Sequence, residues 1–305
     1  MDLVNAFLNI FAPIFTVTTF FLFFPAYLCF KSLHYFWRSI FSENVAGKVV
    51  VIAGASSGIG EHIAYEYGKR GAFLVIGARR ENALREVAER AYLVGSPGAI
   101  PVPTDISKVE DCKTLIQEAI NQFGRLDHLV VAAGVTPLSM FEDTFEVANF
   151  APAMASKAAV VSFFETLRTE FGSDIQITLV TPGLVESEMT KGKFLDKEGK
   201  MVVDQDLRDV VMSAIPVELV GRCAKAIVDG ACRGDKYLTV PPWFRTTFFI
   251  KMMLPEATDW FNRWFCITEP GIPATEAISK KVVDLPGLKD ILWPDSIRSP
   301  KIKTN

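Results

Sequence analysis

The chain has 305 residues, of which 50% are hydrophobic, and a formal net charge of -3. This length allows one large α/β domain with appended segments. The nearly balanced charge, with basic residues spread along the chain, argues against a nucleic-acid partner. Five widely spaced cysteines without a CxxC pair suit a reducing compartment and predict neither a disulfide framework nor a metal site.

Residues 7–30 form a run of 24 residues without a charged side chain. As a helix this run would extend about 36 Å, enough for a hydrocarbon core of about 30 Å. A cleaved signal peptide is the weaker interpretation, because no basic residue precedes the run and no cleavage site follows it. We therefore expect residues 1–44 to anchor the chain in a membrane or lipid droplet. Basic residues after the run predict that the rest of the chain faces the cytosol.

Pro13 and Pro25 lie inside this apolar run. Each proline removes a backbone donor and bends a helix, so the prolines leave two forms of anchor open. One is a kinked transmembrane helix. The other is a bent hairpin that enters a single leaflet or the surface of a lipid droplet.

From residue 45 onward, short apolar runs that predict strands alternate with longer runs that predict helices. The predicted strands lie at residues 48–53, 73–78, 99–102, 128–133, 176–181 and 237–240. The predicted helices lie at residues 61–70, 81–92, 109–123, 141–171, 206–213 and 216–232. This alternation predicts a doubly wound parallel α/β sheet of Rossmann type at residues 45–265.

The C-terminal part is harder to interpret from its composition. Residues 241–265 are rich in Trp and Phe but contain charges, so they cannot span a bilayer. A lid or interfacial segment and ordinary packing both remain open for them. We expect residues 266–305 to be a C-terminal extension, and the proline-containing part after Asp284 to be a loose surface segment.

A glycine-rich turn follows the first predicted strand and opens a helix. At such a turn, backbone N–H groups and the positive helix end meet a phosphate, and glycines allow the backbone to approach it closely. The pattern predicts a pyrophosphate site for a dinucleotide cofactor at Gly54, Ser56, Ser57, Gly58, Ile59 and Gly60.

The same turn also spells G-x-S-x-G, with Ser56 in the position of a serine-hydrolase nucleophile. That nucleophile should follow several strands rather than the first one. The histidine well downstream, His128, lies at the start of a predicted strand, where a structural role is more common. A serine hydrolase is therefore the minor alternative.

Arg79 and Arg80 follow the second predicted strand, where an acidic residue would bind a free ribose 2'-hydroxyl. Adjacent guanidinium groups favour a 2'-phosphate through charge-assisted and often bidentate hydrogen bonds. We therefore expect NADP(H) rather than NAD(H).

Over about residues 46–240 these motifs resemble the short-chain dehydrogenase/reductase family. The anchor with its two prolines, the run Ala-Arg79-Arg80-Glu and the run Leu126-Asp-His-Leu-Val resemble plant hydroxysteroid dehydrogenases of the steroleosin type. The resemblance implies NADP(H)-dependent hydride transfer with a steroid-like alcohol or ketone, a location at the endoplasmic reticulum or lipid droplet, and a homodimer. It also assigns cofactor contacts to Asp105, Gly134, Pro182, Gly183, Val185 and Ser187.

The family uses a catalytic tetrad of Asn, Ser, Tyr and Lys, of which Asn149 and Lys157 match the first and last members. The lysine would also bind the cofactor. The tyrosine should stand four residues before Lys157, where this chain has Ala153, and no tyrosine occurs between Tyr92 and Tyr237.

Only seven residues separate Asn149 from Lys157, whereas a strand with its helix needs about 30. A single internal deletion accounts for the loss of the fifth strand, the serine and the tyrosine together. We expect a compressed six-stranded sheet in which strand 176–181 moves beside strand 128–133. Activity should fall severely while cofactor binding survives. The alternative is a catalytically inactive NADP-binding or structural lipid-droplet protein, and a splice form or gene-model error would also explain the gap.

Overall fold

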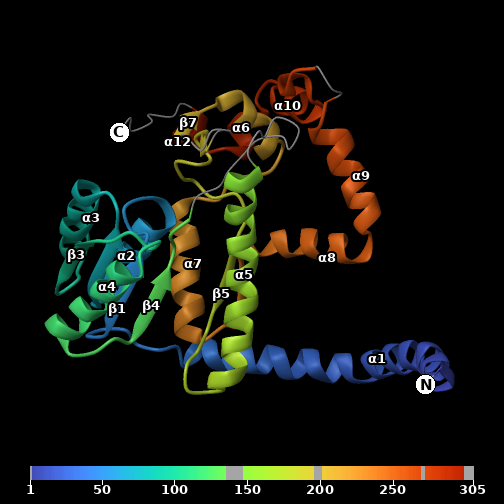
Figure 1. The fold of residues 1–305 in the computed structure, drawn as a ribbon, viewed down its shortest axis with the longest axis horizontal. Coiled ribbons are helices and arrows are strands. Elements are labelled where there is room, and N and C mark those ends of the chain that lie inside the picture. Colours follow the sequence, from blue (N-terminus) through green and yellow to red (C-terminus); the bar gives the residue numbers. More distant parts are fainter. Residues whose placement is uncertain (1, 135–146, 196–200, 269–271, 299–305) are drawn as a thin grey trace. The chain divides into compact units, whose positions relative to one another are not determined.

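The computed structural model describes residues 2–134, 147–195, 201–268 and 272–298 (Figure 1). The chain divides into two compact units, residues 1–43 and 44–305.

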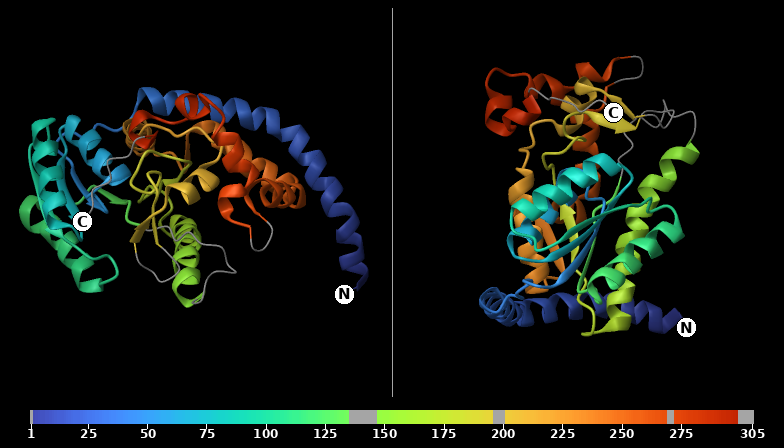
Figure 2. Two further views of the ribbon diagram at one scale, coloured as in Figure 1. Left: turned by 90° about the horizontal axis from the view of Figure 1, so that it is seen from above. Right: turned by 90° about the vertical axis from the view of Figure 1, so that its left-hand side faces the viewer.

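The first unit consists mainly of one helix, α1 (Asp2–Ile40), whose apolar side chains are exposed. Its segment Val4–Ile40 is long and apolar enough to cross a membrane, by length and composition. The helix continues through Pro13 and Pro25, and Figure 2 shows it bending along its length, as expected where prolines interrupt helical hydrogen bonds. The structure thus shows one continuous bent helix over Asp2–Ile40.

The second unit is built on a four-stranded parallel sheet with the order β3-β2-β1-β4. Its strands are β1 (Val49–Ala53), β2 (Phe73–Ala78), β3 (Ala99–Pro103) and β4 (His128–Val131). The helices between them are α2 (Gly58–Lys69), α3 (Glu81–Leu93) and α4 (Val109–Phe123). The parallel Rossmann-type sheet predicted from the alternation of strands and helices is confirmed.

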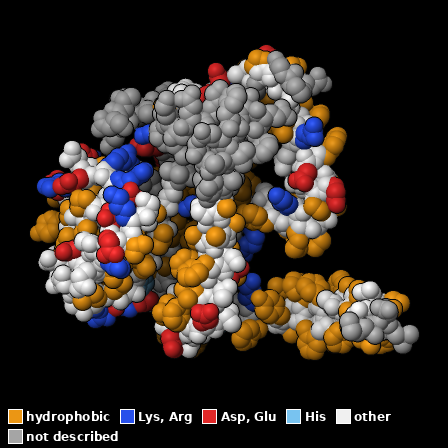
Figure 3. All heavy atoms as spheres, in the orientation of Figure 1, with side chains coloured by type: hydrophobic (Ala, Val, Ile, Leu, Met, Phe, Trp, Pro, Cys, Tyr) orange, Lys and Arg blue, Asp and Glu red, His pale blue; other side chains and the backbone are white. Residues whose placement is uncertain are grey.

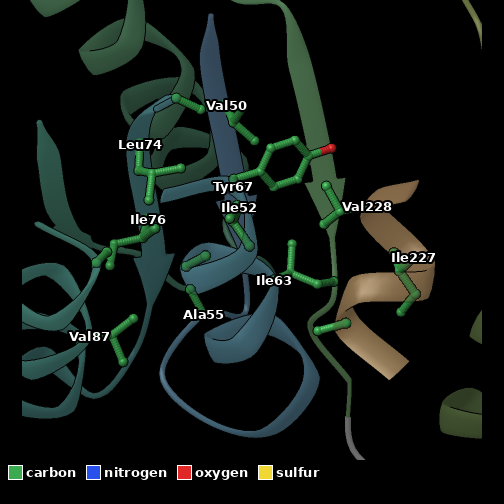
Figure 4. Packing of buried hydrophobic residues seen from close by; sticks show 14 of the residues in the cluster. Val50, Ile52, Ala55, Ile63, Tyr67, Leu74, Ile76, Val87, Ile227 and Val228 are labelled. Carbon is green, nitrogen blue, oxygen red and sulfur yellow. The ribbon is translucent and has the colours of Figure 1, made fainter. Parts of the chain in front are cut away.

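Strand β1 is the centre of the hydrophobic core, because helices cover both of its faces. On one face Ile52 packs with Ile63 and Tyr67 of α2 and with Val228 of α7 (Val220–Arg233) (Figure 4). On the other face Val51 packs with residues of α4. Burial of a valine or isoleucine side chain contributes about 1.5–3 kcal/mol, so this double coverage explains why β1 is apolar without alternation.

Strand β5 (Leu179–Pro182) belongs to a second sheet, in which it pairs in parallel with β8 (Tyr237–Val240). The expected compressed sheet of six strands is therefore wrong. Within the described residues β4 pairs with β1 alone, so β5 has not moved beside it. Helix α5 (Val147–Phe171) precedes β5, in agreement with the predicted helical run.

Helix α7 packs on α2 and so joins the β5–β8 sheet to the first sheet. Helix α7 leads into β8, and its buried side chains Cys223, Ala224 and Val228 join the core cluster of α2. The Arg70 guanidinium at the end of α2 also donates to Asp229 Oδ1 over 2.7 Å. This interface fixes α7, and with it β8, against the first sheet.

The chain between β5 and the C-terminus forms short elements. Strands β6 (Lys193–Leu195) and β7 (Met201–Val203) pair antiparallel and precede α6 (Gln205–Met212). After β8 follow η2 (Pro242–Phe244), α8 (Arg245–Met253), α9 (Pro255–Cys266), η3 (Ala274–Glu276), α10 (Ile278–Val283), α11 (Leu288–Leu292) and α12 (Asp295–Arg298).

The expected loose segment after Asp284 is wrong as far as Arg298. Trp293 and Ile297 are only 2% and 0% exposed, and they pack with Met212 of α6. Proline content suggested a surface segment, but it does not reveal whether the apolar residues between the prolines find a core to pack against.

Helices α8 and α9, in contrast, contain no buried residue. Large apolar side chains such as Met252 and Trp260 are 67% exposed, and Figure 3 shows hydrophobic side chains on the surface of these helices, interspersed with charged ones. The rest of the described unit therefore leaves much of the apolar surface of these helices uncovered.

Candidate functional site

The turn between β1 and α2 requires glycine for steric reasons. Gly54 has a φ of +90°, and a Cβ placed on it would lie 2.5 Å from the backbone nitrogen of Ala133. A Cβ on Gly60 would lie 2.2 Å from the Gly54 carbonyl oxygen. The backbone of the turn thus lies against the end of β4 and against itself. This leaves the N-terminus of α2, which begins after Ser57, facing outward as a site for an anion.

Arg80 contacts this turn directly. Its Nη2 donates to Ser57 Oγ over 2.6 Å and to Ser56 Oγ over 3.3 Å. Arg80 follows β2, the neighbour of β1 in the sheet, so the end of β2 places a cation beside the glycine turn that follows β1. Two serine hydroxyls, a helix N-terminus and a guanidinium together form a donor set that suits a phosphate group.

Arg79, the preceding residue, is exposed. Asp105 follows β3, where hydrogen bonds from the backbone and side chain of Ser107 hold its pKa below the usual range, and the positive charge of Arg79 adds to this effect. The two adjacent arginines therefore act on different groups. Arg79 acts electrostatically on the Asp105 carboxylate, and Arg80 contacts the serine hydroxyls of the glycine turn.

A pocket of about 190 Å³ lies at this turn. One of its walls is the glycine turn with Arg80, and the opposite wall is the loop that follows β5. The residues contributed by these two walls include Ser56, Ser57, Gly58, Arg80, Ser187 and Glu188. Of these, Glu188 was not among the residues singled out in the sequence, because its role depends on a contact with Arg80, 108 positions away.

The loop after β5 also contains the other residues expected from the Pro-Gly motif. Gly183 donates its N–H to the Val240 carbonyl over 2.8 Å, which keeps the end of β5 beside β8. Val185 is buried in the main core cluster. The backbone N–H of Ser187 donates to Thr190 Oγ1 over 2.8 Å, so Ser187 and its neighbours form a compact turn that faces Gly58.

Lys157 lies at the end of β4, at the same edge of the sheet as the glycine turn. Its Nζ donates to the Ala133 carbonyl over 3.0 Å. A Cβ on Gly134 would lie 2.6 Å from that Nζ, so the glycine leaves room for the lysine. The ε-ammonium group is thus held at the same edge of the sheet as Gly54. The side chain of Asn149 lies outside the described part of the structure.

Two tyrosines of the described second unit donate hydrogen bonds to glutamates. Burial, together with the hydrogen bond that Tyr65 donates to Glu61, raises the pKa of Tyr65 to about 12, and Tyr237 donates to Glu165. None of the described residues that line the pocket is a tyrosine. An acid or base of the type expected from the family is therefore not found beside Lys157 among the described residues.

The geometry also separates the two residues of the hydrolase alternative. His128 begins β4 and pairs in register with Val50 near the start of β1, whereas Ser56 follows the other end of β1. His128 Nδ1 instead contacts the hydroxyl of Tyr67 at 3.0 Å. Because Ser56 and His128 lie at opposite ends of the parallel strands, His128 cannot act as the base for Ser56.

Comparison with known proteins agrees with this architecture. The family model for short chain dehydrogenase matches residues 48–150 and 144–198. Among solved structures, a short-chain type dehydrogenase/reductase from Mycobacterium marinum has a TM-score of 0.55 at 18% identity, covering 66% of this chain and 96% of its own. The L-sorbose reductase from Gluconobacter frateurii, solved with NADPH and L-sorbose, has a TM-score of 0.54 at 21% identity, covering 65% of this chain and 97% of its own. At these identities the two structures show likeness of fold.

Much closer in sequence are curated plant proteins. An "11-beta-hydroxysteroid dehydrogenase A" from Arachis hypogaea is 46% identical, and an "11-beta-hydroxysteroid dehydrogenase 1A" from Arabidopsis thaliana is 43% identical, each over the full length of both chains. Both alignments span 349 positions although this chain has 305 residues, so 44 aligned positions lack a residue of this chain. The protein described here belongs to the short-chain dehydrogenase family and is similar to plant 11-beta-hydroxysteroid dehydrogenases.

Proposed function

We propose that this chain is a membrane-anchored, NADP(H)-binding member of the family whose capacity for hydride transfer is severely reduced. The observation that carries the proposal is the position of Arg80 on the two serines of the glycine turn. A guanidinium at this point offers a 2'-phosphate two charge-assisted donors, whereas a free 2'-hydroxyl gains much less from it. The glycine turn and the α2 N-terminus bind the pyrophosphate, and Arg80 favours NADP(H) over NAD(H).

The reaction type comes from the names of the relatives. They are named 11-beta-hydroxysteroid dehydrogenases, and we carry over to this scaffold the interconversion of a steroid-like alcohol and ketone. When bound, NADP(H) supplies or accepts the hydride. Lys157, held at the end of β4, binds the nicotinamide ribose and keeps the cofactor oriented.

The proposed loss of turnover rests on what the chain lacks. Ala153 stands where the family has its tyrosine, and no tyrosine lies between Tyr92 and Tyr237. A positioned acid or base typically contributes about 10²- to 10⁴-fold to the rate, and the developing alkoxide also loses its hydrogen-bonding donors. We assign the 44 unmatched alignment positions to the interval between Asn149 and Lys157, where the family's strand, serine and tyrosine would lie.

Two measurements on the full chain test this proposal together. NADPH and NADH are titrated by fluorescence, and hydride transfer to a ketosteroid is followed by NADPH absorbance, with the Arachis hypogaea relative as the positive control. We expect NADPH to bind more tightly than NADH while turnover stays at least about 100-fold below the control. Turnover comparable to the control would overturn the inactive assignment, and a lack of NADPH binding would overturn the cofactor assignment. Sequencing the transcript across Phe150 to Met154 tests whether the gap is a splice form or a gene-model error.

We also propose that α1 anchors the protein at the endoplasmic reticulum or lipid droplet, with the second unit in the cytosol. Its length and apolar surface support this. The exposed aromatic side chains of α8 and α9 support an additional contact with an interface. Membrane fractionation after alkaline wash tests the anchor, since a chain released by the wash is not inserted. Because dimers are common in this family, we also propose that the chain forms a homodimer.

A further inference from the structure

The guanidinium of Arg80 is shared between two walls of the pocket. Its Nη2 donates to Ser56 and Ser57 of the glycine turn, and its Nη1 donates to Glu188 Oε1 over 3.3 Å. Glu188 belongs to the loop after β5. Strand β5 lies in a different sheet from β2, the strand that precedes Arg80. The ion pair therefore spans the pocket from the first sheet to the second.

Glu188 has a second cation at its other oxygen. Lys193 Nζ on β6 donates to Glu188 Oε2 over 3.2 Å, and the Lys193 side chain is 15% exposed. Partial burial raises the pKa of Glu188, but the charges of Arg80 and Lys193 outweigh it and hold that pKa below the usual range. Glu188 is thus an anion held by two cations at the site where we propose that the phosphate of the cofactor binds.

The pocket leaves little free space beside Arg80. Its volume of about 190 Å³ is below the roughly 300–1,000 Å³ of pockets that hold small ligands and cofactors. Ser187, next to Glu188, lies in van der Waals distance of a Cβ placed on Gly58. A 2'-phosphate placed on the Arg80 guanidinium would therefore meet the Glu188 carboxylate, which already accepts a hydrogen bond from Nη1.

We propose that Glu188 competes with the 2'-phosphate of the cofactor for Arg80, and so sets how strongly the site prefers NADP(H) to NAD(H). The inference rests on the proposed cofactor site. Two anions on one guanidinium repel each other, so the phosphate must displace the carboxylate, which remains paired with Lys193. NAD(H) has no 2'-phosphate and leaves the Arg80–Glu188 pair in place. The intact pair consequently lowers the affinity for NADP(H) more than the affinity for NAD(H).

The test is the ratio of the NADH to the NADPH dissociation constant, measured by fluorescence titration of the full chain in nanodiscs. Glu188→Gln keeps the shape of the side chain and removes its charge. We expect the variant to bind NADPH roughly 3- to 10-fold more tightly, as an exposed ion pair is weak, while NADH changes less than about twofold. An unchanged or smaller ratio would overturn the inference, because it would mean that Glu188 positions Arg80 rather than competing for it.

Glu186→Gln is the matched control. Glu186 lines the same pocket and carries the same charge, but its carboxylate accepts a hydrogen bond from Ser296 and not from Arg80. Removal of this charge should alter NADPH and NADH binding by the same factor. If it raises the ratio as much as Glu188→Gln does, general repulsion rather than competition for Arg80 explains the result, and the inference fails.

A double-mutant cycle with Arg80→Ala completes the experiment. In the Arg80→Ala background Glu188→Gln should no longer change the ratio, because the shared cation is gone. A full effect in that background contradicts the inference. Failure of the proposed function looks different, since then the unsubstituted chain and all variants bind neither nucleotide although their thermal unfolding is cooperative.

Discussion

Strands β1 and β4 lie side by side in one sheet, yet their side chains have very different surroundings. All five residues of β1 are buried, whereas Leu129 and Val131 of β4 are 54% and 56% exposed. Strand β1 has a strand on each side and helices on both faces, but the described residues give β4 a neighbour on one edge alone. The complete surroundings coincide with the half that carries the glycine turn, and the incomplete ones with the half in which we propose that the family's catalytic tyrosine is missing.

The largest effect should come from completing the incomplete half. We predict that inserting the 44-position segment of the Arachis hypogaea relative between Phe150 and Met154 raises ketosteroid reduction by about 10²-fold or more, because an acid and a hydrogen-bonding donor return to the site. NADPH consumption measures the rate. The same insertion with its tyrosine changed to phenylalanine should stay inactive. An active phenylalanine version would show that the tyrosine is not the missing group.

Two glycine substitutions test the half of the fold that carries the glycine turn. Gly54→Ala should lower the melting temperature by about 6–12 °C, from a destabilisation of about 3 kcal/mol, because the methyl group overlaps the backbone of Ala133 and the φ is positive. Gly124→Ala also has a positive φ, but a Cβ there meets nothing within 4 Å. It should lower the melting temperature by about 2–4 °C. Equal shifts measured by thermal unfolding in detergent would contradict the claimed close contact between the turn and β4.

The two arginines after β2 offer a third comparison. Arg80→Ala should weaken NADPH binding about 10- to 100-fold, because the charge-assisted donor beside Ser56 and Ser57 is lost. Arg79→Ala should weaken it less than about fivefold, since the exposed Arg79 does not line the pocket. Fluorescence titration measures both constants. A larger loss for Arg79→Ala would reverse the assignment of the 2'-phosphate contact.

The smallest effect is expected on the exposed face of β4. Val51→Ala in β1 should reduce the free energy of unfolding by about 2 kcal/mol, because it leaves a cavity between the sheet and α4. Val131→Ala in β4 removes the same atoms from a half-exposed position and should cost less than about 0.5 kcal/mol. Urea unfolding of the full chain measures both. A large cost for Val131→Ala would mean that its side chain is covered in solution.

Short-range patterns were sufficient for much of the cofactor half. The apolar run at residues 48–53, the glycines of the turn and the arginines after residue 78 each reflect a local requirement: burial on two faces, close backbone approach, or an anion partner. The sequence interval between Asn149 and Lys157 also indicated that a strand is missing. The separation of β5 from β4 could not be predicted. It depends on contacts between segments that are distant in the sequence, such as those that Val228 and Asp229 of α7 make with α2.

The sequence by itself determined the parallel α/β fold, the long apolar N-terminal helix and the glycine turn, because each depends on residues close together in the chain. Tertiary structure decided which arginine faces the turn, that β5 remains with β8, and that Trp293 and Ile297 are buried. It also brought Glu188 to Arg80. These features depend on contacts between distant segments, and the free energy of such contacts is set by packing and charge in three dimensions.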